Sequence, residues 1–274
     1  MRAHQHGAGV TTSGGRITVS VSAGIASVEI DDPAHRNAFT KAMCIEVEQL
    51  MPQLDADPDV VAITLRGARA AFSAGAAIGD LTSVLMDPQE DGTTVDHLSR
   101  ADQAITSLSK PTIAVVDGAC MGGGWQIASA CDFIVASERS VFAITPAKLG
   151  VIYPRAGIER LVRQVGPATA KYLLLTGVAM PAAQARELGL VAVVIPDGEF
   201  ANACNALVGT VVRNSRFSTH TLKSLVDATA SSAPQRDERW AAAWAAMSTG
   251  PDMTIGVEAF LHREQPRFVW APQP

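Results

Sequence analysis

The chain has 274 residues, of which 47% are hydrophobic and 18% charged, a composition typical of a globular protein with one large domain and an appendage. Its formal net charge is -5 and it has no block of basic residues, so nucleic-acid binding is not expected. No run of 18 consecutive apolar residues occurs, so the sequence predicts no membrane span.

The first part of the chain predicts alternating strands and helices. Residues 1–15 are small, polar and glycine-rich and are interpreted as a disordered leader. Apolar and polar residues alternate on both sides of a Ser-Ala-Gly turn, which predicts a hairpin over 16–30. The apolar residues of 40–54 follow helical spacing, with Thr40 placed to cap the helix. Three further segments are a buried strand at 60–67, a small-residue loop at 70–80 and a polar, mobile stretch at 82–96.

The second part predicts more strands and then helices alone. The predicted strands are 110–118, 133–137, 141–144 and 190–196, and the helices among them are 98–108, 124–131, 155–164, 167–176 and 181–188. Strand signals stop near residue 197, after which 198–213, 218–230, 235–247 and 252–263 all have a helical pattern. We therefore predict a mixed α/β core over 16–196 and a helical region over 197–274.

Three consecutive glycines, Gly122 to Gly124, lie between a predicted strand and a predicted helix. A P-loop requires lysine where Gly124 stands, and a dinucleotide-binding fingerprint requires glycine where Ile127 stands, so both nucleotide motifs are incomplete. The remaining functional interpretation of the glycines is a helix start. Its free N–H groups would bind an anion, or an oxygen that becomes anionic during a reaction. Tight packing of the helix on the strand would also explain the glycines.

A second loop of small residues, FSAGAAIGD, follows another predicted strand and favours the binding interpretation. Two such loops can each direct one backbone N–H at the same oxygen, which makes a two-amide oxyanion hole. The loop also holds Ser73, but Ala71 stands where the first glycine of a GxSxG nucleophile elbow belongs. The motif of a serine hydrolase is therefore incomplete.

The cysteines and the N-terminal histidines do not indicate a metal site. Cys44, Cys120, Cys131 and Cys204 form no CxxC pair and no zinc-ligand spacing, so they are interpreted as reduced, mostly buried thiols of a cytoplasmic protein. His4 and His6 lie in the predicted leader and are interpreted as solvated. We therefore predict no bound metal.

Several motifs, taken in order, resemble the successive signatures of the enoyl-CoA hydratase/isomerase, or crotonase, superfamily. They are DDPAHRNAF, AFSAGAAIGD, KPTIAVVDGACMGGGWQIASACDFIVAS, FAITPAKLG, VGPATAKYLLLTG, ARELGLVAVVIP and the terminal AFLHREQPRF. The resemblance runs from about residue 16 to 268 and is highly specific for the fold. It implies an α/β fold class, a crotonase-type spiral of ββα turns with a C-terminal helical trimerisation region.

The resemblance also implies an acyl-CoA thioester as ligand, so that coenzyme A enters as part of the substrate and no tightly bound cofactor is expected. The thioester oxygen would accept hydrogen bonds from the amides of Ala76 and Gly123, which stabilises an enolate. The expected assembly is a homotrimer or a dimer of trimers.

The coenzyme's 3′-phospho-ADP part would, by the same resemblance, lie near residues 36–38, which are Arg36, Asn37 and Ala38, with Ala74 close to the adenine. Arg36 and Lys41 would be the nearest cations for phosphate, although Lys41 has an ordinary alternative as a solvated surface charge.

This sequence departs from the family pattern where acid–base chemistry is usually carried. Hydratases of the family use two glutamates, and their positions here hold Gln126 and Pro146. Some relatives place a catalytic aspartate slightly later, where Pro154 stands. A carboxamide has no useful basicity near neutral pH, although it can orient a water or a carbonyl. Simple hydration of an enoyl-CoA is therefore not expected.

The candidates for replacing the missing acid–base groups are Tyr153 first, and then Arg155, Asp80 and His97. Each has a structural alternative: Tyr153 lines the acyl pocket, Arg155 pairs with Glu159 one turn later, Asp80 caps a helix and His97 faces solvent.

Two hypotheses remain open. The first is a lyase or isomerase that stabilises a thioester enolate and catalyses isomerisation, decarboxylation or C–C cleavage. The second is a catalytically silent acyl-CoA-binding protein or assembly subunit. Both predict binding of a CoA thioester, and only the first predicts turnover. A serine hydrolase would instead predict labelling of Ser73 by an active-site serine probe.

Overall fold

The computed structural model describes residues 14–230 and 235–271. Of the predicted leader, only residues 14 and 15 are described, so the disorder predicted for it and the interpretation of His4 and His6 lie outside the described residues.

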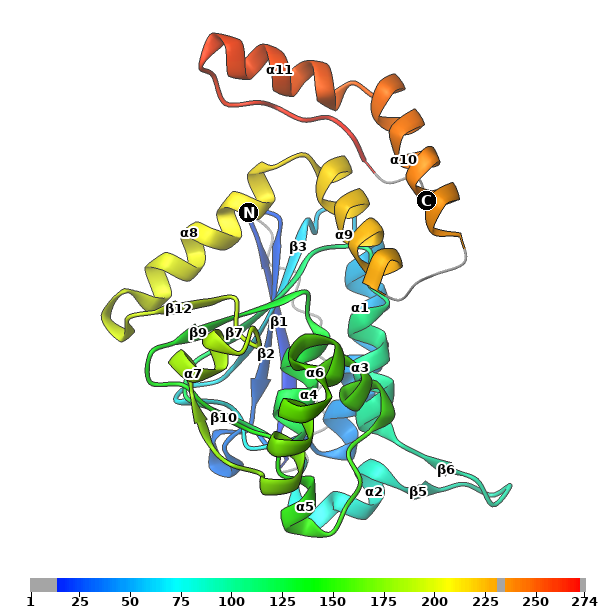
Figure 1. The fold of residues 1–274 in the computed structure, drawn as a ribbon, viewed down its shortest axis with the longest axis vertical. Helices are drawn as coiled ribbons and strands as arrows, with labels where there is room; N and C mark the ends of the chain where they lie inside the picture. The colour runs from blue at the N-terminus through cyan, green and yellow to red at the C-terminus, as the bar shows by residue number, and fades with distance from the viewer. Residues whose placement is uncertain (1–13, 231–234, 272–274) are drawn as a thin grey trace.

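Two sheets form the framework (Figure 1). The larger has the strand order β1-β2-β3-β7-β9-β12 and is parallel except for the β1–β2 hairpin. The smaller has the order β11-β10-β8-β4. The strands of the larger sheet are β1 (Arg16–Ser22), β2 (Ile25–Asp31), β3 (Ala62–Gly67), β7 (Thr112–Val116), β9 (Phe133–Ser137) and β12 (Val193–Ile195). Those of the smaller are β4 (Ala71–Ser73), β8 (Ala119–Met121), β10 (Val141–Ala143) and β11 (Met180–Pro181).

The chain alternates between these sheets in a repeating spiral. The pairs β3–β4, β7–β8 and β9–β10 each place their first strand in the larger sheet and their second in the smaller one. A helical segment follows each pair, as a parallel sheet requires. These segments are η2 (Ile78–Asp80), α2 (Leu81–Leu85) and α3 (His97–Thr106), then α4 (Gly123–Ala130), then α5 (Pro146–Leu149) and α6 (Arg155–Thr176). This is the ββα spiral that was predicted.

The predicted N-terminal hairpin and the helix after it are confirmed at the level of individual residues. The hairpin pairs Arg16 with Asp31 and Ser22 with Ile25. Helix α1 (Lys41–Ala56) follows Thr40, whose side chain accepts a 3.3 Å hydrogen bond from the Met43 amide. This bond satisfies one of the free N–H groups at the helix start.

Other segments hold elements that were not predicted. The stretch 82–96, predicted only as polar and mobile, contains most of α2 and a hairpin of β5 (Asp87–Pro88) and β6 (Thr94–Val95). Strand β4 lies in the segment predicted as a small-residue loop, and β8 lies between the predicted strand 110–118 and the glycine run, where no strand was predicted. Three residues are too few to show alternation. By contrast, the two helices predicted over 155–164 and 167–176 are confirmed, because α6 is interrupted at Gly166, whose φ of 74° and ψ of 165° are not helical.

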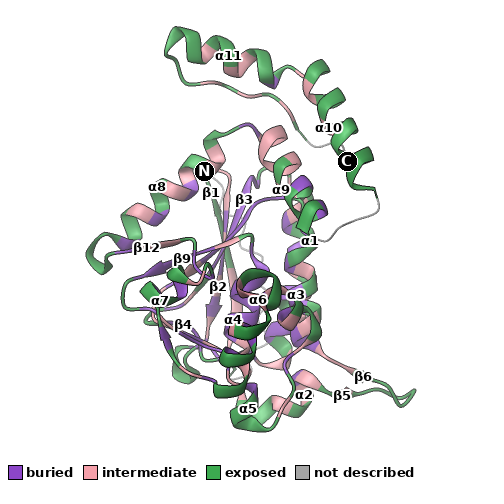
Figure 2. Cartoon of the chain, viewed as in Figure 1, coloured by how far each residue is buried: buried purple, intermediate pink, exposed green. Residues whose placement is uncertain are grey.

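Large aromatic side chains fill the space between the sheets and the helices. Trp125, Phe39, Phe72 and Phe142 are all fully buried, and the rings of Trp125 and Phe142 meet edge to face with centroids 5.6 Å apart. Figure 2 shows the buried residues concentrated on the strands and on α4. Helix α4 is therefore held within the core, where its first turn can be positioned accurately.

The C-terminal elements are α7 (Ala182–Glu187), η3 (Asp197–Glu199), α8 (Phe200–Arg213), α9 (Arg216–Ala230), α10 (Arg236–Thr249) and α11 (Asp252–His262). Helix α8 buries Phe200, Cys204 and Val208 against the larger sheet. By contrast, α10 has no buried residue and α11 has only Asp252. Figure 1 shows these last two helices extending away from both sheets.

The described part of the chain contains no helix with both the length and the apolar character needed to cross a membrane. All four cysteines are free and buried. Burial raises the pKa of the Cys44 thiol to about 12 and that of Cys120 well above its usual range. These thiols therefore stay protonated and unreactive at neutral pH.

Candidate functional site

Two loops meet at the ends of adjacent strands in the smaller sheet. Strands β4 and β8 are parallel neighbours, so the segments that follow them leave from the same edge. The first segment contains Ala76 and the second contains Gly123, the first residue of α4. A Cβ atom placed on Gly123 would lie 3.0 Å from the Ala76 nitrogen. The two amides that the sequence singled out are therefore brought together.

The glycine run is explained by two different requirements. Gly122 has φ 49° and ψ −110°, a conformation that residues with a side chain rarely adopt. At Gly124, a Cβ atom would come within 2.7 Å of the Ser73 Cβ and 2.8 Å of the Ser73 backbone carbonyl oxygen. Gly122 thus makes the sharp entry into α4, and Gly124 lets the helix pack closely on β4. The close-packing alternative was therefore correct for Gly124.

Neither of the two facing amides has an acceptor among the residues that the structure describes. The neighbouring Gly122 amide donates to Ala143 O at 2.8 Å and the Ala77 amide to Phe39 O at 2.8 Å, whereas the amides of Ala76 and Gly123 make no such bond. Gly123 is also at the positive end of the α4 dipole. Two unpaired N–H groups in one place can bind one oxygen atom that carries negative charge.

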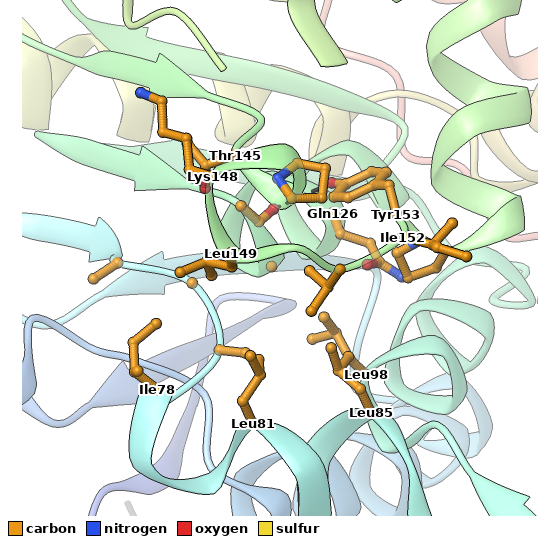
Figure 3. A pocket seen from close by; sticks show the side chains of 18 residues that line it. Ile78, Leu81, Leu85, Leu98, Gln126, Thr145, Lys148, Leu149, Ile152 and Tyr153 are labelled. Atoms are coloured by element: carbon orange, nitrogen blue, oxygen red, sulfur yellow. Dashed lines mark hydrogen bonds between the residues drawn. The ribbon is translucent and has the colours of Figure 1, made fainter. Parts of the chain in front are cut away.

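These amides lie at the wall of a cavity of about 280 Å³ (Figure 3). Most of its lining is aliphatic and comes from η2, α2, α3, α5 and the segment after α5. These side chains include Ile78, Leu81, Leu85, Leu98, Leu149 and Ile152. A cavity of this size and character fits a short acyl chain rather than a highly charged group.

Gln126 is the most unusual polar residue of this cavity. Its side chain is 0% exposed, and both its Oε1 and Nε2 atoms lack a hydrogen-bond partner among the described residues. It lies one helical turn after Gly123 and lines the cavity. A buried carboxamide without a partner is destabilising by about 1–3 kcal/mol for each unpaired group, so such groups are rarely retained without a function.

Tyr153 lies on the same wall and its hydroxyl donates to the Gly122 carbonyl at 3.1 Å. Burial, with Asp102 and Cys120 nearby, raises the pKa of Tyr153 well above its usual range. The phenol therefore stays protonated near neutral pH. Its one proton is directed at the peptide bond that links Gly122 to Gly123.

The positions at which the family resemblance led us to expect acids also face the cavity. Gln126, Pro146 and Pro154 all line it, and no Asp or Glu occurs among the described residues of its wall. The wall does contain Lys148, whose side chain turns toward Gly177: a Cβ atom on Gly177 would lie 2.9 Å from the Lys148 Cε. The cavity wall thus combines two unpaired amides with, among its described residues, no carboxylate.

Behind the cavity, a buried ion pair joins α3, α4 and α6. Arg160 Nη2 lies 2.6 Å from Asp102 Oδ1, and Nη1 lies 3.1 Å from Oδ2. The same Nη1 donates to Ser129 Oγ at 3.0 Å and approaches the Gln126 carbonyl oxygen at 3.4 Å. Sequence reasoning missed this pair. Its only signal was Asp102, a charged residue on the otherwise apolar face of helix 98–108.

The residues predicted to lie near a nucleotide form one corner of the fold. The Ala74 amide donates to Arg36 O at 2.9 Å, which joins the two loops. Asn37 and Ala38 are buried, and the Asn37 side chain is saturated, since it accepts from Asp32 N and donates to Ala68 O and Ala71 O. The Asn37 amide is bonded as well, to Asp32 O at 2.7 Å, so neither its side chain nor its N–H is free to contact a ligand.

The cations of this corner differ in what they contact. Arg36 is exposed and makes no ion pair with any described residue. Lys41 instead binds Asp87 at 2.6 Å. Asp87 also accepts from His97 Nε2 at 3.0 Å, and His97 is only 6% exposed. The solvent-facing alternative for His97 was therefore wrong, because Asp87 holds it inside.

The remaining candidates lie outside the cavity or are otherwise occupied. Ser73 is buried and its Oγ accepts from the Gly75 amide at 3.1 Å, so it stabilises the loop. Arg155 pairs with Glu159 at 2.6 Å with its side chain 91% exposed, as the structural alternative predicted. Asp80 precedes α2 but makes no capping hydrogen bond. Among the described residues, no group of three or more His, Cys, Asp or Glu side chains is arranged to hold a metal.

Comparisons with known proteins point to one family. The family model described as enoyl-CoA hydratase/isomerase matches residues 20–270. A crystal structure of an enoyl-CoA hydratase/isomerase family member is similar at 61% identity and a TM-score of 0.93, with 96% of this chain and 100% of that chain covered.

Curated proteins give the same result. A Thermus thermophilus protein provisionally named an enoyl-CoA hydratase is 35% identical over 248 residues, which is 89% of this chain and 97% of the relative. The peroxisomal Delta(3,5)-Delta(2,4)-dienoyl-CoA isomerase of Arabidopsis thaliana is 29% identical over 251 residues, 87% of this chain and 90% of the relative.

Proposed function

Because the chain belongs to the enoyl-CoA hydratase/isomerase family, which acts on acyl-CoA thioesters, we propose that its cavity binds a thioester carbonyl between the amides of Ala76 and Gly123 and stabilises the enolate derived from it. The observation that carries the proposal is the pair of unpaired N–H groups at the wall of an aliphatic cavity. Each such donor contributes about 2.7–4 kcal/mol of transition-state stabilisation in enzymes of known mechanism.

The thioester carbonyl and the coenzyme would then occupy adjacent parts of the surface. Ala74 lines the cavity and its amide is bonded to Arg36 O, so the exposed Arg36 guanidinium is close to the route by which the coenzyme would leave the cavity. Arg36 is the cation proposed to bind phosphate, because Lys41 is already paired with Asp87. Asn37 and Ala38 would shape this corner rather than donate to the ligand, because their amides are already bonded to Asp32 O and His35 O.

The chemistry proposed for this site is one that needs no carboxylate from the protein. General acid–base groups contribute about 10²–10⁴-fold to rate, and Gln126 and Pro146 cannot supply that contribution. Isomerisation, decarboxylation or C–C cleavage can proceed with proton transfer to substrate groups or water, once the enolate is stabilised. Tyr153 would act as a positioning residue, since it holds the peptide that carries the Gly123 amide.

A second candidate, a catalytically silent acyl-CoA-binding protein, rests on the same lack of acids among the described residues of the cavity wall. Both candidates place the thioester in the same cavity. They differ only in whether an acyl-CoA is converted.

We also propose that the protein self-associates through α10 and α11, as a trimer or a dimer of trimers. Trp240 and Trp244 are one turn apart on α10, and Val257, Phe260 and Leu261 form a stripe on α11. These side chains are 47% to 83% exposed in the single chain. Apolar residues at helical spacing that face solvent are typical of an interface.

The binding proposal is tested by infrared difference spectroscopy with butanoyl-CoA that carries ¹³C at the thioester carbonyl. Two hydrogen bonds polarise this carbonyl and should move its stretch to lower frequency on binding. The Gly123→Ala variant places a methyl group 3.0 Å from the Ala76 nitrogen and should abolish the shift. Gly79→Ala is the matched control, because a Cβ atom there has no neighbour within 4 Å.

Failure of the wild-type protein to bind any CoA thioester would refute the proposal. A turnover assay with a panel of acyl-CoAs separates the two candidates: conversion of any member supports the enzyme, and tight binding without conversion supports the silent binder.

A further inference from the structure

Strand β1 is an outer strand of the larger sheet, and one of its two sides has no neighbouring strand among the described residues. It pairs with β2 in a continuous register of seven residues, from Arg16–Asp31 to Ser22–Ile25. The other outer strands of the two sheets are short, since β12 and β4 have three residues each and β11 has two. Natural sheets usually protect a long outer strand with proline, lysine or a bulge. The sequence of β1, RITVSVS, has neither proline nor lysine, and its register has no bulge.

The hairpin turn determines which backbone groups of β1 point outward. Ala23 and Gly24 form a two-residue turn, with positive φ angles of 49° and 79°. The residues that flank such a turn are a hydrogen-bonded pair, so the backbone groups of Ser22 point toward β2. These directions alternate along an antiparallel pair. Residues 17, 19 and 21 therefore direct their N–H and C=O groups away from β2.

One of these outward groups is already used. The Ile17 amide donates to Glu46 Oε2 of α1 at 2.8 Å, which confirms that it points away from β2. By contrast, the N–H and C=O groups of Val19 and Val21 have no hydrogen-bond partner among the described residues. These two residues are 40% and 47% exposed. The unused part of the edge is therefore the short stretch from Val19 to Val21, and it is open to another strand.

A second copy of β1 is the strand that fits this stretch. When two copies pair antiparallel about a two-fold axis at Ser20, Val19 of each copy lies opposite Val21 of the other. Each of these two pairs exchanges two hydrogen bonds, so the contact has four. A pairing centred on Val19 would need the Ile17 amide, which Glu46 already holds, and one centred on Val21 would need a residue of the turn. The two-fold register at Ser20 therefore uses both free residues without either conflict.

The side chains permit this register as well. The two valines are β-branched and lie on one face of the strand, where they form cross-strand pairs. The opposite face brings Thr18 against Ser22, and both are small and uncharged. Arg16, the only charged residue of β1, lies outside the pairing and is held by Asp31 at 3.0 Å. The pairing therefore places no like charges opposite each other.

We propose that β1 is a self-association surface, through which the larger sheets of two copies pair edge to edge about a two-fold axis at Ser20. Such a contact closes on itself, so it makes pairs rather than filaments. Only two residues of each strand are engaged in hydrogen bonds, so the contact is weak and forms at high protein concentration. It is separate from the cavity and from the surface on α10 and α11, so it does not depend on the functions proposed for them.

The register is tested by disulfide trapping in the full-length protein. In Ser20→Cys, the two introduced thiols face each other in a non-hydrogen-bonded pair, whose Cα atoms are about 4.5 Å apart, close enough for a disulfide. In Thr18→Cys, the matched control on the same face, the thiol lies opposite Ser22 and meets no second thiol. With oxidised glutathione as the oxidant, Ser20→Cys should form a disulfide-linked pair of chains and Thr18→Cys should not. The native cysteines are buried, so they do not compete.

The strength of the contact is tested by light scattering over a series of protein concentrations. Phe260→Asp serves as the parent, because it removes the contact proposed for α11. Its mass should rise from that of one chain in dilute solution toward that of two chains as the concentration increases. Adding Val19→Pro removes an outward N–H group, a change that an outer strand tolerates, and should abolish the rise. Adding Val19→Thr keeps the N–H group and should leave the rise unchanged.

Equal cross-linking of the two cysteine variants, or none in Ser20→Cys, would overturn the inference. A mass that does not rise with concentration would overturn it too, as would a rise that survives Val19→Pro, because the contact would then lie elsewhere. If Val19→Pro fails to fold, the two cysteine variants still decide. None of these results bears on the acyl-CoA proposal, which is tested by ligand binding.

Discussion

The Tyr153 hydroxyl donates a 3.1 Å hydrogen bond to the carbonyl of Gly122, and the other end of that same peptide bond is the Gly123 amide that faces the cavity. A hydrogen bond to a peptide carbonyl both orients the peptide plane and makes its N–H a stronger donor. One side chain from the segment after α5 therefore acts on a backbone group at the start of α4.

The first prediction follows from this contact. In Tyr153→Phe, the thioester carbonyl of bound ¹³C-butanoyl-CoA should show a smaller infrared shift than in the wild-type protein, while the affinity falls by less than about 10-fold, because one neutral hydrogen bond is lost. If Tyr153 had only a structural role, Tyr153→Phe would lower the stability of the protein but leave the infrared shift in the folded molecules unchanged. Arg155→Ala, two positions later and with its side chain 91% exposed, is the control.

The second prediction concerns hydration. The wild-type protein should hydrate crotonyl-CoA at no more than a background rate, because its cavity wall has no carboxylate among the described residues. Gln126→Glu should not restore the full rate, since Pro146 still stands where the second acid would be. The assay is the loss of enoyl absorbance. Rapid hydration by the wild-type protein would contradict the prediction and reveal an acid–base pair from elsewhere.

The third prediction concerns Asp87, whose pKa is lowered to about 2 by hydrogen bonds from Lys41 and His97. An unfolded aspartate titrates near pH 3.9, so the carboxylate stabilises the folded state above about pH 4, and this stabilisation is lost as the pH falls toward 2. The melting temperature of the wild-type protein should therefore fall more between pH 5 and pH 2.5 than that of Asp87→Asn. Asp80→Asn, which removes an exposed carboxyl that makes no capping bond, is the control for the substitution itself.

The fourth prediction compares two ion pairs. Asp102→Ala leaves the buried Arg160 charge without its partner and should lower the free energy of unfolding by about 3–5 kcal/mol. Glu159→Ala breaks the exposed pair with Arg155 and should change the free energy of unfolding by less than about 1 kcal/mol. Urea denaturation measures both. Similar values for the two variants would mean that Arg160 finds another partner or water when Asp102 is removed.

The fifth prediction tests the proposed assembly. Phe260 is 83% exposed on α11, and Phe260→Asp should reduce the mass measured by light scattering from that of an oligomer to that of a single chain. Glu258→Asp, an exposed acidic residue two positions earlier, is the control and should keep the wild-type mass. A wild-type protein that is already monomeric would refute the self-association proposal.

The sequence predicted those parts of the fold that depend on local patterns. Thr40 begins a helix because its own side chain caps it, and the glycines after β8 mark a helix entry because Gly122 needs a positive φ. These signals lie within a few residues of the feature that they specify. The family signatures then supplied the order of the spiral.

What the sequence could not show depends on contacts between distant residues. The Arg160–Asp102 pair spans 58 positions and the Tyr153–Gly122 bond spans 31, and no local pattern predicts either. Likewise, a glutamine in the sequence gives no sign of being buried without a partner. That property of Gln126 exists only once α4 is packed against the aliphatic walls.

The two amides at the cavity wall belong to the main chain, so they are less easily removed by mutation than the side chains around them. Most substitutions at Ala76 leave its N–H in place, whereas one codon change at Gln126 or Tyr153 replaces the group that meets or orients the ligand. In the proposed site, recognition of a carbonyl is therefore built into the backbone path, and the side chains around it are free to diverge. A lineage with this fold can lose one reaction, keep its ligand and acquire another reaction without rebuilding the framework.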